Sequence, residues 1–441
     1  MFLSKRSTLN RAGSDQRFCL LFLAVALFLS LGVGGCASQK LRDARDEFHA
    51  GNVAGANQAL AGMDDYPTRD RLLYHMERGT ILFNLAAYEE SVQEFLAASK
   101  LITEQEVISI SRQTGSIVTS EWFTEYKGEY SERLWVHSYL MMNFLLLDQY
   151  EAALVEAKQA LKLFAVFPDV LRKEYAARAL IGSCYEFLLD YDDAYIEFKK
   201  LFDDMPQKKN LARHLYGLAW RLGYKDDFGV YTPYLSAADM EKVQKADSTE
   251  LIVFVEIGRA PVKVASNIIV PPSIRFSWPK YTSSPTDYGM RVKNRDLEAT
   301  GMTVSTDMGA LLRSSLSARA EIMIVKEAAR VGVKEVIAQA VGRENGELAG
   351  AAVRLLFFLT EEADTRGWET LPGGLALVRI PLLPGKHRIE LDVFGGAGGS
   401  LGNIILPEFE IQKGQKIFKS VRWPVRKMPN NPPEKKKMDP Q

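Results

Sequence analysis

Internal repetition constrains this chain more than any other feature of its 441 residues. Between about residues 39 and 245, apolar residues recur at helical spacing and the connections are short. The same pattern of residue types recurs along this stretch: a small residue within a helix, a turn, a tyrosine, then a small residue and a phenylalanine. The order is complete in Gly182, Tyr185, Tyr191, Ala194 and Phe198, and partial in Gly79 and Tyr88, in Tyr150 and Ala153, and around Val53. Such helical pairs cannot bury their apolar faces alone, so neighbouring pairs must stack.

These copies resemble tetratricopeptide repeats, in which small residues let two antiparallel helices approach and aromatic residues fill the gap between repeats. The spacing of Val53, Tyr88, Tyr150 and Tyr191 is uneven, which predicts an insertion near 103–130 and a longer loop around 164–171. His75 and His137 occupy equivalent positions, and we interpret both as repeat packing. We assign repeat packing to Gly79, Tyr88, Tyr150, Ala153, Gly182, Tyr185, Tyr191, Ala194 and Phe198.

The resemblance implies a protein partner in a concave groove between the repeats. The residues expected to face that groove are Met76, Thr80, Phe83, Ser138, Met142, Leu145, Ser183 and Glu186. Packed core is an equally good explanation for about half of them.

The amino terminus has the pattern of a secretory signal. A basic stretch precedes an uncharged apolar run from Phe18 to Val33, which is short for a membrane-spanning helix. The run ends in Val33-Gly34-Gly35-Cys36, which resembles a lipobox; this implies cleavage between Gly35 and Cys36 and lipid on Cys36. An uncleaved anchor is the alternative. In well-studied Gram-negative bacteria, an aspartate directly after the lipidated cysteine resembles a signal for retention in the inner membrane. No aspartate follows Cys36, which favours the outer membrane, facing the periplasm, over the inner membrane or the cell surface.

Beyond residue 248 the composition changes to strand-forming residues. Leu251–Val255 predicts a buried strand, Ser305 or Thr306 predicts the cap of a helix with a possible break near Gly332, and 347–361 predicts another helix. Further strands are expected at 375–380, 387–394, 404–412 and 416–423. The predicted fold class is therefore α+β: a helical repeat solenoid followed by a β-rich, sandwich-like domain with an inserted helical block.

The predicted domains follow from these boundaries: a removed signal at 1–35, a repeat domain at 36–245, a β-rich domain at 249–423 with helices near 305–361, and a disordered tail at 424–441. Formal net charge is zero, which argues against a nucleic-acid partner. The five histidines have no metal-ligand spacing, so we expect no metal and no cofactor. Cys184 is expected to be a buried apolar residue.

Two local sequences suggest chemistry only weakly. The glycine-rich stretch 395–400 lacks the lysine of a phosphate loop and reads as a strand connection. Asp364-Thr365-Arg366-Gly367-Trp368 reads as an ion pair with an aromatic plug rather than as a binding site. The stretches 126–156, 256–261 and 364–372 resemble a family of bacterial envelope lipoproteins that brings no established activity.

These features favour a membrane-anchored scaffold that binds a protein partner through its repeats and is not an enzyme. A regulator of cell-wall synthesis is one alternative. The other is an envelope enzyme with its site in the C-terminal half, for which Asp364 and Glu256 are the acids to test.

Overall fold

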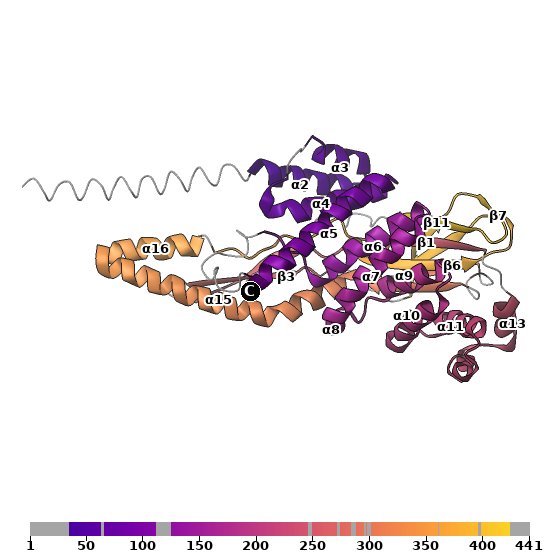
Figure 1. The fold of residues 1–441 in the computed structure, drawn as a ribbon. Helices are drawn as coiled ribbons and strands as arrows, with labels where there is room; N and C mark the ends of the chain where they lie inside the picture. Colours follow the sequence, from indigo (N-terminus) through magenta and orange to yellow (C-terminus); the bar gives the residue numbers. More distant parts are fainter. Residues whose placement is uncertain are drawn as a thin grey trace, which may run out of the picture. The chain divides into compact units, whose positions relative to one another are not determined.

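The computed structural model describes residues 35–62, 66–111, 125–245, 249–270, 274–283, 288–294, 297, 301–359, 361–395 and 398–423 (Figure 1). The chain divides into two compact units, Met1–Thr68 and Arg69–Gln441. The composition change near residue 248 therefore falls inside the second unit. The signal sequence before Gly35, residues 112–124 of the predicted insertion and the predicted disordered tail lie outside the described residues.

The first unit contains one helical pair, α2 (Gly35–His49) and α3 (Val53–Leu60). Gly51 adopts a left-handed backbone in the turn between them, with φ of +89°. The Asn52 side chain then caps α3 by accepting a hydrogen bond from the Gly55 amide at 3.0 Å.

The second unit begins with further helical pairs, and the short helix η1 (Thr68–Asp70) spans the boundary. In chain order these helices are α4 (Arg71–Asn84), α5 (Tyr88–Ser111), α6 (Tyr130–Leu146), α7 (Tyr150–Val166), α8 (Pro168–Leu171), α9 (Tyr175–Phe187), α10 (Tyr191–Asp204), α11 (Lys209–Leu222), η3 (Lys225–Asp227), α12 (Phe228–Tyr231), η4 (Thr232–Tyr234) and α13 (Ala237–Lys245).

The turns of three helical pairs repeat one backbone geometry. The residue two positions before the tyrosine that begins the second helix has positive φ in each: Ala86 at +58°, Asp148 at +57° and Leu189 at +65°. A left-handed residue ends a helix and reverses the chain within a short turn. The recurrence supports the predicted repeats, since none of these residues is the glycine that this geometry usually requires.

Side-chain contacts repeat as well. Residues 19 apart form a polar contact in each of three repeats: a hydrogen bond of His75 with Glu94 at 2.7 Å, one of His137 with Glu156 at 2.7 Å, and an ion pair of Arg178 with Glu197 at 2.9 Å. The histidines are therefore repeat-packing residues, as predicted.

The predicted small residues also pack as expected. A Cβ on Gly79 would meet the Phe95 ring at 2.8 Å, and one on Gly182 would meet the Phe198 ring at 2.9 Å. The predicted Ala153 and Ala194 are fully buried and Tyr185 is buried, whereas Tyr88, Tyr150 and Tyr191 are partly exposed.

The strands of the second unit are β1 (Glu250–Ile257), β2 (Lys263–Val270), β3 (Ile274–Tyr281), β4 (Gly289–Val292), β5 (Met302–Asp307), β6 (Gly374–Pro381), β7 (Gly385–His387), β8 (Glu390–Phe394), β9 (Ser400–Ile405), β10 (Phe409–Ile411) and β11 (Lys416–Trp423). Four of them form a mixed sheet in the order β11-β1-β6-β5, in which only the pairing of β1 with β11 is parallel. A second sheet has the order β4-β8-β9, and β10-β7 and β2-β3 are two-stranded.

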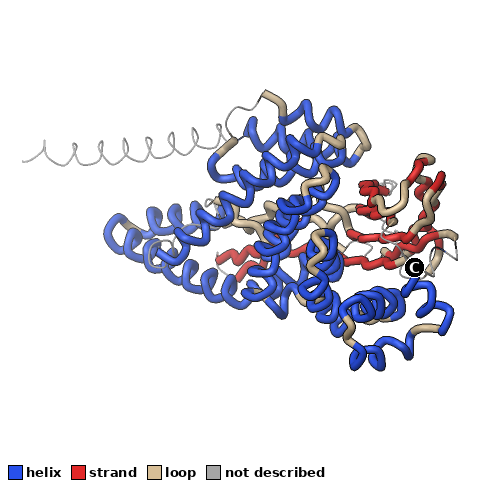
Figure 2. The backbone as a smooth tube through the Cα atoms, turned by 45° about the vertical axis from the view of Figure 1, so that its right-hand side comes forward, coloured by secondary structure: helices blue, strands red, loops and turns tan. Residues whose placement is uncertain are grey.

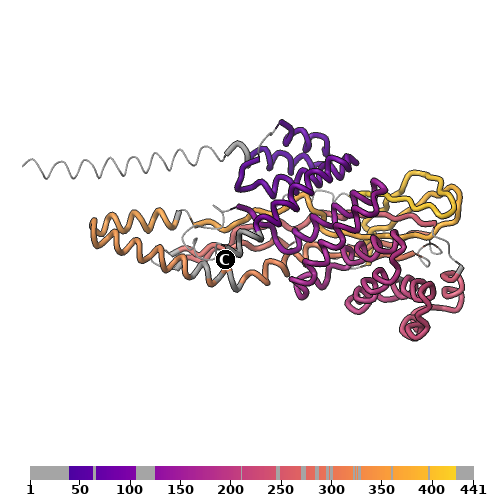
Figure 3. Tube along the Cα trace, viewed as in Figure 1, coloured from indigo at the N-terminus to yellow at the C-terminus, as the bar shows by residue number. Residues whose placement is uncertain are grey.

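Strand β1 is buried on both faces. Its residues Leu251, Val253 and Val255 share a core with residues of β4, β6 and β8. The alternate residue Glu256 receives a hydrogen bond from Tyr139 on α6. Since both faces are covered, β1 is an unbroken apolar run in the sequence rather than an alternating one. Figure 3 shows strands of this sheet beside α6 and α9, which are far away in the sequence, and Figure 2 shows strands in red among the blue helices.

Two helices lie between β5 and β6 in the sequence, α15 (Met308–Asn345) and α16 (Glu347–Leu359), and we call this helical hairpin the arm. The two helices approach closely, because a Cβ on Gly350 would lie 2.9 Å from the Ala338 carbonyl oxygen. The predicted cap is wrong: Ser305 and Thr306 belong to β5, and Asp307 caps α15 by accepting from the Ala310 amide at 2.8 Å. The helix continues unbroken through Gly332.

The predicted strands of the C-terminal half agree with the structure at β1, β6 and β11. Two predicted strands, 387–394 and 404–412, are each divided, because β7 pairs with β10 while β8 pairs with β9. The strands β2, β3, β4 and β5 were not predicted. The glycine-rich stretch connects β8 to β9, with 396–397 outside the described residues. No helix in the described part of the chain is both long and apolar enough to cross a membrane.

We predict that Leu189→Gly stabilises the protein. A non-glycine residue with left-handed backbone costs about 1–2 kcal/mol, and glycine would remove this cost while adding a smaller entropy cost in the unfolded chain. Leu189 is 66% exposed, so little burial is lost. Thermal unfolding should show a raised Tm. Ile196→Gly, at a 47% exposed position inside α10, is the control and should lower it; a lowered Tm for both variants would contradict the prediction.

Candidate functional site

An extended segment of the chain's own C-terminal half, residues 361–373, packs against one side of the helical pairs. We call this side, which carries Glu77, Thr80 and Glu132, the inner side. The Glu77 carboxylate on α4 accepts hydrogen bonds from the backbone amides of Glu369 at 2.9 Å and Thr370 at 3.1 Å. Glu132 on α6 accepts from the amide of Trp368 at 3.0 Å. Two carboxylates from different repeats thus bind the segment by its backbone.

The Trp368 side chain fills the space between these repeats. Its indole nitrogen donates to the Thr80 hydroxyl at 2.9 Å, and its ring lies 5.7 Å from the Phe95 ring and 5.5 Å from the Tyr139 ring. Only 2% of the residue is exposed. The apolar ring and the satisfied N–H together make it a buried anchor.

Arg366 fixes the other end of the bound segment. Its guanidinium donates to Asp364 at 2.7 Å and to Asp70 at 2.8 Å, and it lies 5.4 Å from the centre of the Tyr126 ring. Burial lowers the pKa of Arg366, but the two carboxylates outweigh burial and the pKa is raised. The ion pair and aromatic plug predicted for 364–368 are confirmed.

Further buried charges connect the helical pairs to the four-stranded sheet. Arg379 on β6 donates to Glu186 at 2.6 Å, to Ser183 at 3.2 Å and to Glu250 at 2.7 Å. Burial raises the pKa of Glu186, but Arg379 and His214 outweigh it, so the pKa is lowered. Each of these charges thus has an opposite partner, as buried charges require.

Another cluster of buried charged side chains lies where the start of β2 meets the start of α6. Lys263 pairs with Glu129 at 2.6 Å, and Arg319 of α15 donates to the same carboxylate at 3.0 Å. Burial alone would raise the pKa of Glu129, but the two cations lower it to about 2. The arm is therefore attached to the repeats at its base through Glu129.

Glu174, just before α9, is a buried carboxyl group of a different kind. The Trp135 indole donates to it at 2.6 Å, and the Thr306 hydroxyl of β5 also forms a hydrogen bond with it. Burial raises its pKa to about 8, although both hydrogen bonds lower it. The group is therefore mostly protonated near neutral pH.

The predicted groove residues lie on this inner side, but the chain's own residues cover them. Thr80 binds Trp368, while Ser183 and Glu186 bind Arg379. Glu186 is partly exposed, and the remaining residues are buried: Met76, Thr80, Phe83, Ser138, Met142, Leu145 and Ser183. The prediction of a partner groove is corrected accordingly: its occupant in this structure is the segment 361–373 together with β6.

The two acids considered for enzyme chemistry also have internal roles. Glu256 accepts from Tyr139, and Asp364 is bound by Arg366. Cys184 is buried, and burial raises the pKa of its thiol, which agrees with the apolar role predicted for it. Gly35 and Cys36 are the first residues of α2.

Sequence reasoning missed Glu77, Glu132, Glu174 and Arg379. Arg379 is a charged residue within an apolar run, and Glu77 lies beside Met76 and one turn before Thr80. A charge on the buried side of a helix requires a partner, and that rule identifies Glu77 as a binding residue. It does not identify the partner, which lies 292 residues away.

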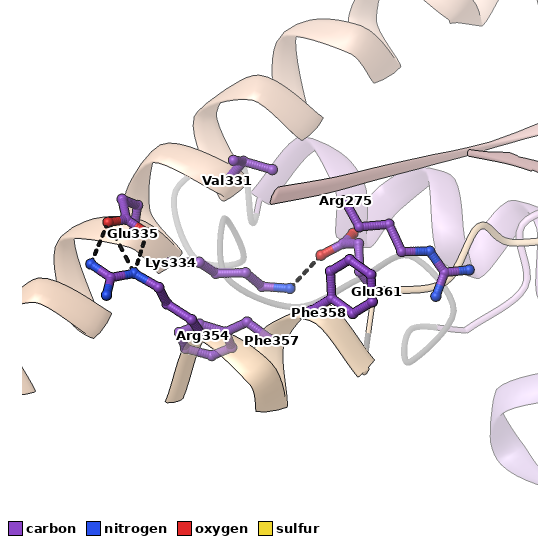
Figure 4. Close-up of a pocket in the computed structure, with 8 residues that line it drawn as sticks. All are labelled: Arg275, Val331, Lys334, Glu335, Arg354, Phe357, Phe358 and Glu361. Carbon is purple, nitrogen blue, oxygen red and sulfur yellow. Dashed lines mark hydrogen bonds and ion pairs between the residues drawn. The ribbon is translucent and has the colours of Figure 1, made fainter. Parts of the chain in front are cut away.

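A shallow hollow separates the arm from β3 (Figure 4). Four of its charged groups form ion pairs, Arg354 with Glu335 at 2.7 Å and Lys334 with Glu361 at 2.5 Å, while Arg275 donates to Asn267 at 3.1 Å. The lining residues are Arg275, Val331, Lys334, Glu335, Arg354, Phe357, Phe358 and Glu361. Internal carboxylates thus already neutralise Lys334 and Arg354.

The helical part of the chain is similar to solved structures of MamA. A structure of MamA residues 41 to the end from Desulfovibrio magneticus RS-1 is 17% identical, with a TM-score of 0.32, and the match covers 48% of this chain and 98% of that one. The MamA RS-1 ArsTM double mutant is also 17% identical, with a TM-score of 0.33 and coverage of 48% and 97%. No protein-family model matches the chain, and no curated protein matches it.

We predict that the free energy of unfolding falls as pH rises from about 5 to about 8. The unfolded chain loses the Glu174 proton near the ordinary pKa of 4.5, whereas the folded chain retains it up to about 8. Rising pH across this interval therefore favours the unfolded chain, by up to a few kcal/mol. Urea unfolding at several pH values measures the effect.

Glu174→Gln cannot ionise, so its free energy of unfolding should fall less over this interval. Glu335→Gln is the control, because Arg354 lowers the pKa of that carboxyl and its titration lies below the interval. Equal slopes in the wild type and in Glu174→Gln would rule out the proposed titration.

Proposed function

We propose that this protein is a lipid-anchored scaffold of the bacterial cell envelope that binds a protein partner. Its localisation would be the periplasmic side of the outer membrane, held by lipid on Cys36. The anchor rests on the sequence alone, on the apolar run and the small residues before Cys36. The scaffold role rests on the helical pairs and on the surfaces they leave exposed.

The partner site proposed here is on the outside of the helical pairs, because the inner side is already filled. The observation that carries this proposal is a set of exposed large residues within the 15-residue stretch 220–234, on α11, α12, η4 and the turn after α11. We call it the aromatic surface: Trp220 is 48% exposed, Tyr224 39%, Val230 45% and Tyr234 39%. Trp220 stacks on Phe228 with ring centres 5.9 Å apart, which holds the indole in place.

Exposed aromatic residues held in place by neighbours suit a protein interface. Tryptophan and tyrosine supply much of the binding energy in such interfaces, since they bury large areas and lose little side-chain entropy. A partner that contacts this surface would leave the inner segment and its carboxylates undisturbed. The repeats would then act as a support for binding rather than as a peptide clamp.

We predict that Trp220→Ala combined with Tyr234→Ala abolishes capture of the partner from envelope extract. The matched control is Val166→Ala, which changes a 66% exposed residue on another helix and should capture the same proteins as the wild type. The affinity of each purified variant for a captured protein should then be measured. Identical capture by all three chains would refute the aromatic surface as the partner site.

The lipid anchor is tested separately. Cys36→Ala should release a folded protein into the soluble periplasmic fraction, because the acylated thiol is the proposed attachment. Cys184→Ala is the control and should remain with the outer membrane on a density gradient. A Cys36→Ala variant that still fractionates with membranes would show that the anchor is wrong, whatever the fate of the partner.

A further inference from the structure

The outer side of α16 exposes a symmetrical row of apolar residues. Leu348 is 89% exposed and Leu355 is 58% exposed, and Ala351 and Ala352 between them are also exposed. All four lie within a single helix, with the leucines at equal distances from a midpoint between the two alanines. The opposite side of α16 is already occupied, since Gly350 contacts α15 and Arg354 binds Glu335.

The row suits a second copy of the same helix. When two identical helices pack antiparallel about a two-fold axis, each residue faces its mirror position across the midpoint. Here Leu348 of one copy would face Leu355 of the other, and Ala351 would face Ala352. Small residues at the crossing point allow the backbones to approach, and the leucines close the two ends of the contact.

We propose that the arm is a self-association surface, on which α16 pairs antiparallel with α16 of a second copy of this chain. The other helix of the arm, α15, also exposes apolar residues. On α15, Val325, Ala329, Gly332 and Val336 are exposed and follow one another at intervals of four, three and four residues. That spacing is typical of a helix that packs along another helix.

The exposed area agrees with a pair that uses both helices. Among the residues of the arm whose exposure the structure describes, five large apolar side chains are exposed by more than a third: Val325, Val336, Ile337, Leu348 and Leu355. At about 80 Å² each they leave roughly 400 Å² of aliphatic surface in water. A stable interface buries about 800 Å² per partner, so these side chains supply about half of it and the exposed small residues between them add to the rest.

A lipid surface fits the arm less well. Interfacial helices carry bulky apolar residues on one side and Lys or Arg on the other. In α16 the middle of the exposed row consists of alanines, and the helix has one basic residue, Arg354, which is paired with Glu335. The favoured occupant is thus a closely approaching helix.

Disulfide trapping in cells with the full chain tests the proposal. Ala352→Cys places a thiol beside the predicted axis, and an oxidising periplasm or a short bis-maleimide would join two copies there. The wild type controls for the native cysteines, and the raised pKa of the buried Cys184 thiol keeps it unreactive. Leu383→Cys is the matched control, since Leu383 is 79% exposed and lies away from the arm, just before β7.

We expect Ala352→Cys to give a cross-linked dimer and Leu383→Cys to give little cross-linked product. Adding Leu348→Lys to Ala352→Cys should abolish the cross-linked dimer. Leu348→Lys changes an exposed side chain, so circular dichroism should be unchanged. Equal cross-linking at both cysteine positions, dimers that survive Leu348→Lys, or cross-linking of Ala352→Cys only to a protein of another mass would each overturn the proposal. The proposal is independent of the partner bound at the aromatic surface and of the anchor at Cys36.

Discussion

The backbone of residues 368–370 is bound by two buried carboxylates, and the second unit of the structure depends on that contact. Glu77 accepts from two amides and Glu132 from a third. Without these two side chains, three backbone N–H groups of the segment would lose their hydrogen-bond partners, and without the segment the buried oxygens of Glu77 and Glu132 would lose the same bonds, at a cost of about 1–3 kcal/mol for each buried group left unpaired. The segment therefore supplies hydrogen-bond donors to the buried side chains of the repeats, and the repeats supply acceptors to the backbone of the segment.

This mutual requirement explains why helices and strands form one unit after residue 68. The segment leads directly into β6, which pairs with β1 and β5 and brings Arg379 to Glu186. Glu174 extends the same connection, because it binds Trp135 of α6 and Thr306 of β5. The helical pairs and the four-stranded sheet thus share buried polar atoms as well as apolar area, and neither surface is available to an external peptide.

For function, the consequence is that a partner would bind on a surface other than the inner side of the helical pairs. Tetratricopeptide-like pairs suggest a partner on the inner surface, but here the inner surface is internal structure and the exposed apolar groups lie elsewhere. The aromatic surface and the row on α16 are separate: one suits a different protein and the other suits a second copy. A scaffold with two such surfaces would hold several partner molecules close together, and a lipid on Cys36 would keep them at a membrane.

The sequence by itself determined the helical pairs, their small-residue contacts and the strands β1, β6 and β11, because these follow from local periodicity and from runs of strand-forming residues. It also predicted the ion pair of Arg366 with Asp364, since these residues are two positions apart. Only the tertiary structure decided that Glu77 binds Thr370 and that Thr80 binds Trp368, since these contacts join residues almost 300 positions apart and any buried acceptor could have served. It also decided that Ser305 and Thr306 form a strand, because pairing with β6 outweighs a local tendency to cap a helix. Periodicity shows which side of a helix is apolar, but what covers that side depends on the rest of the chain.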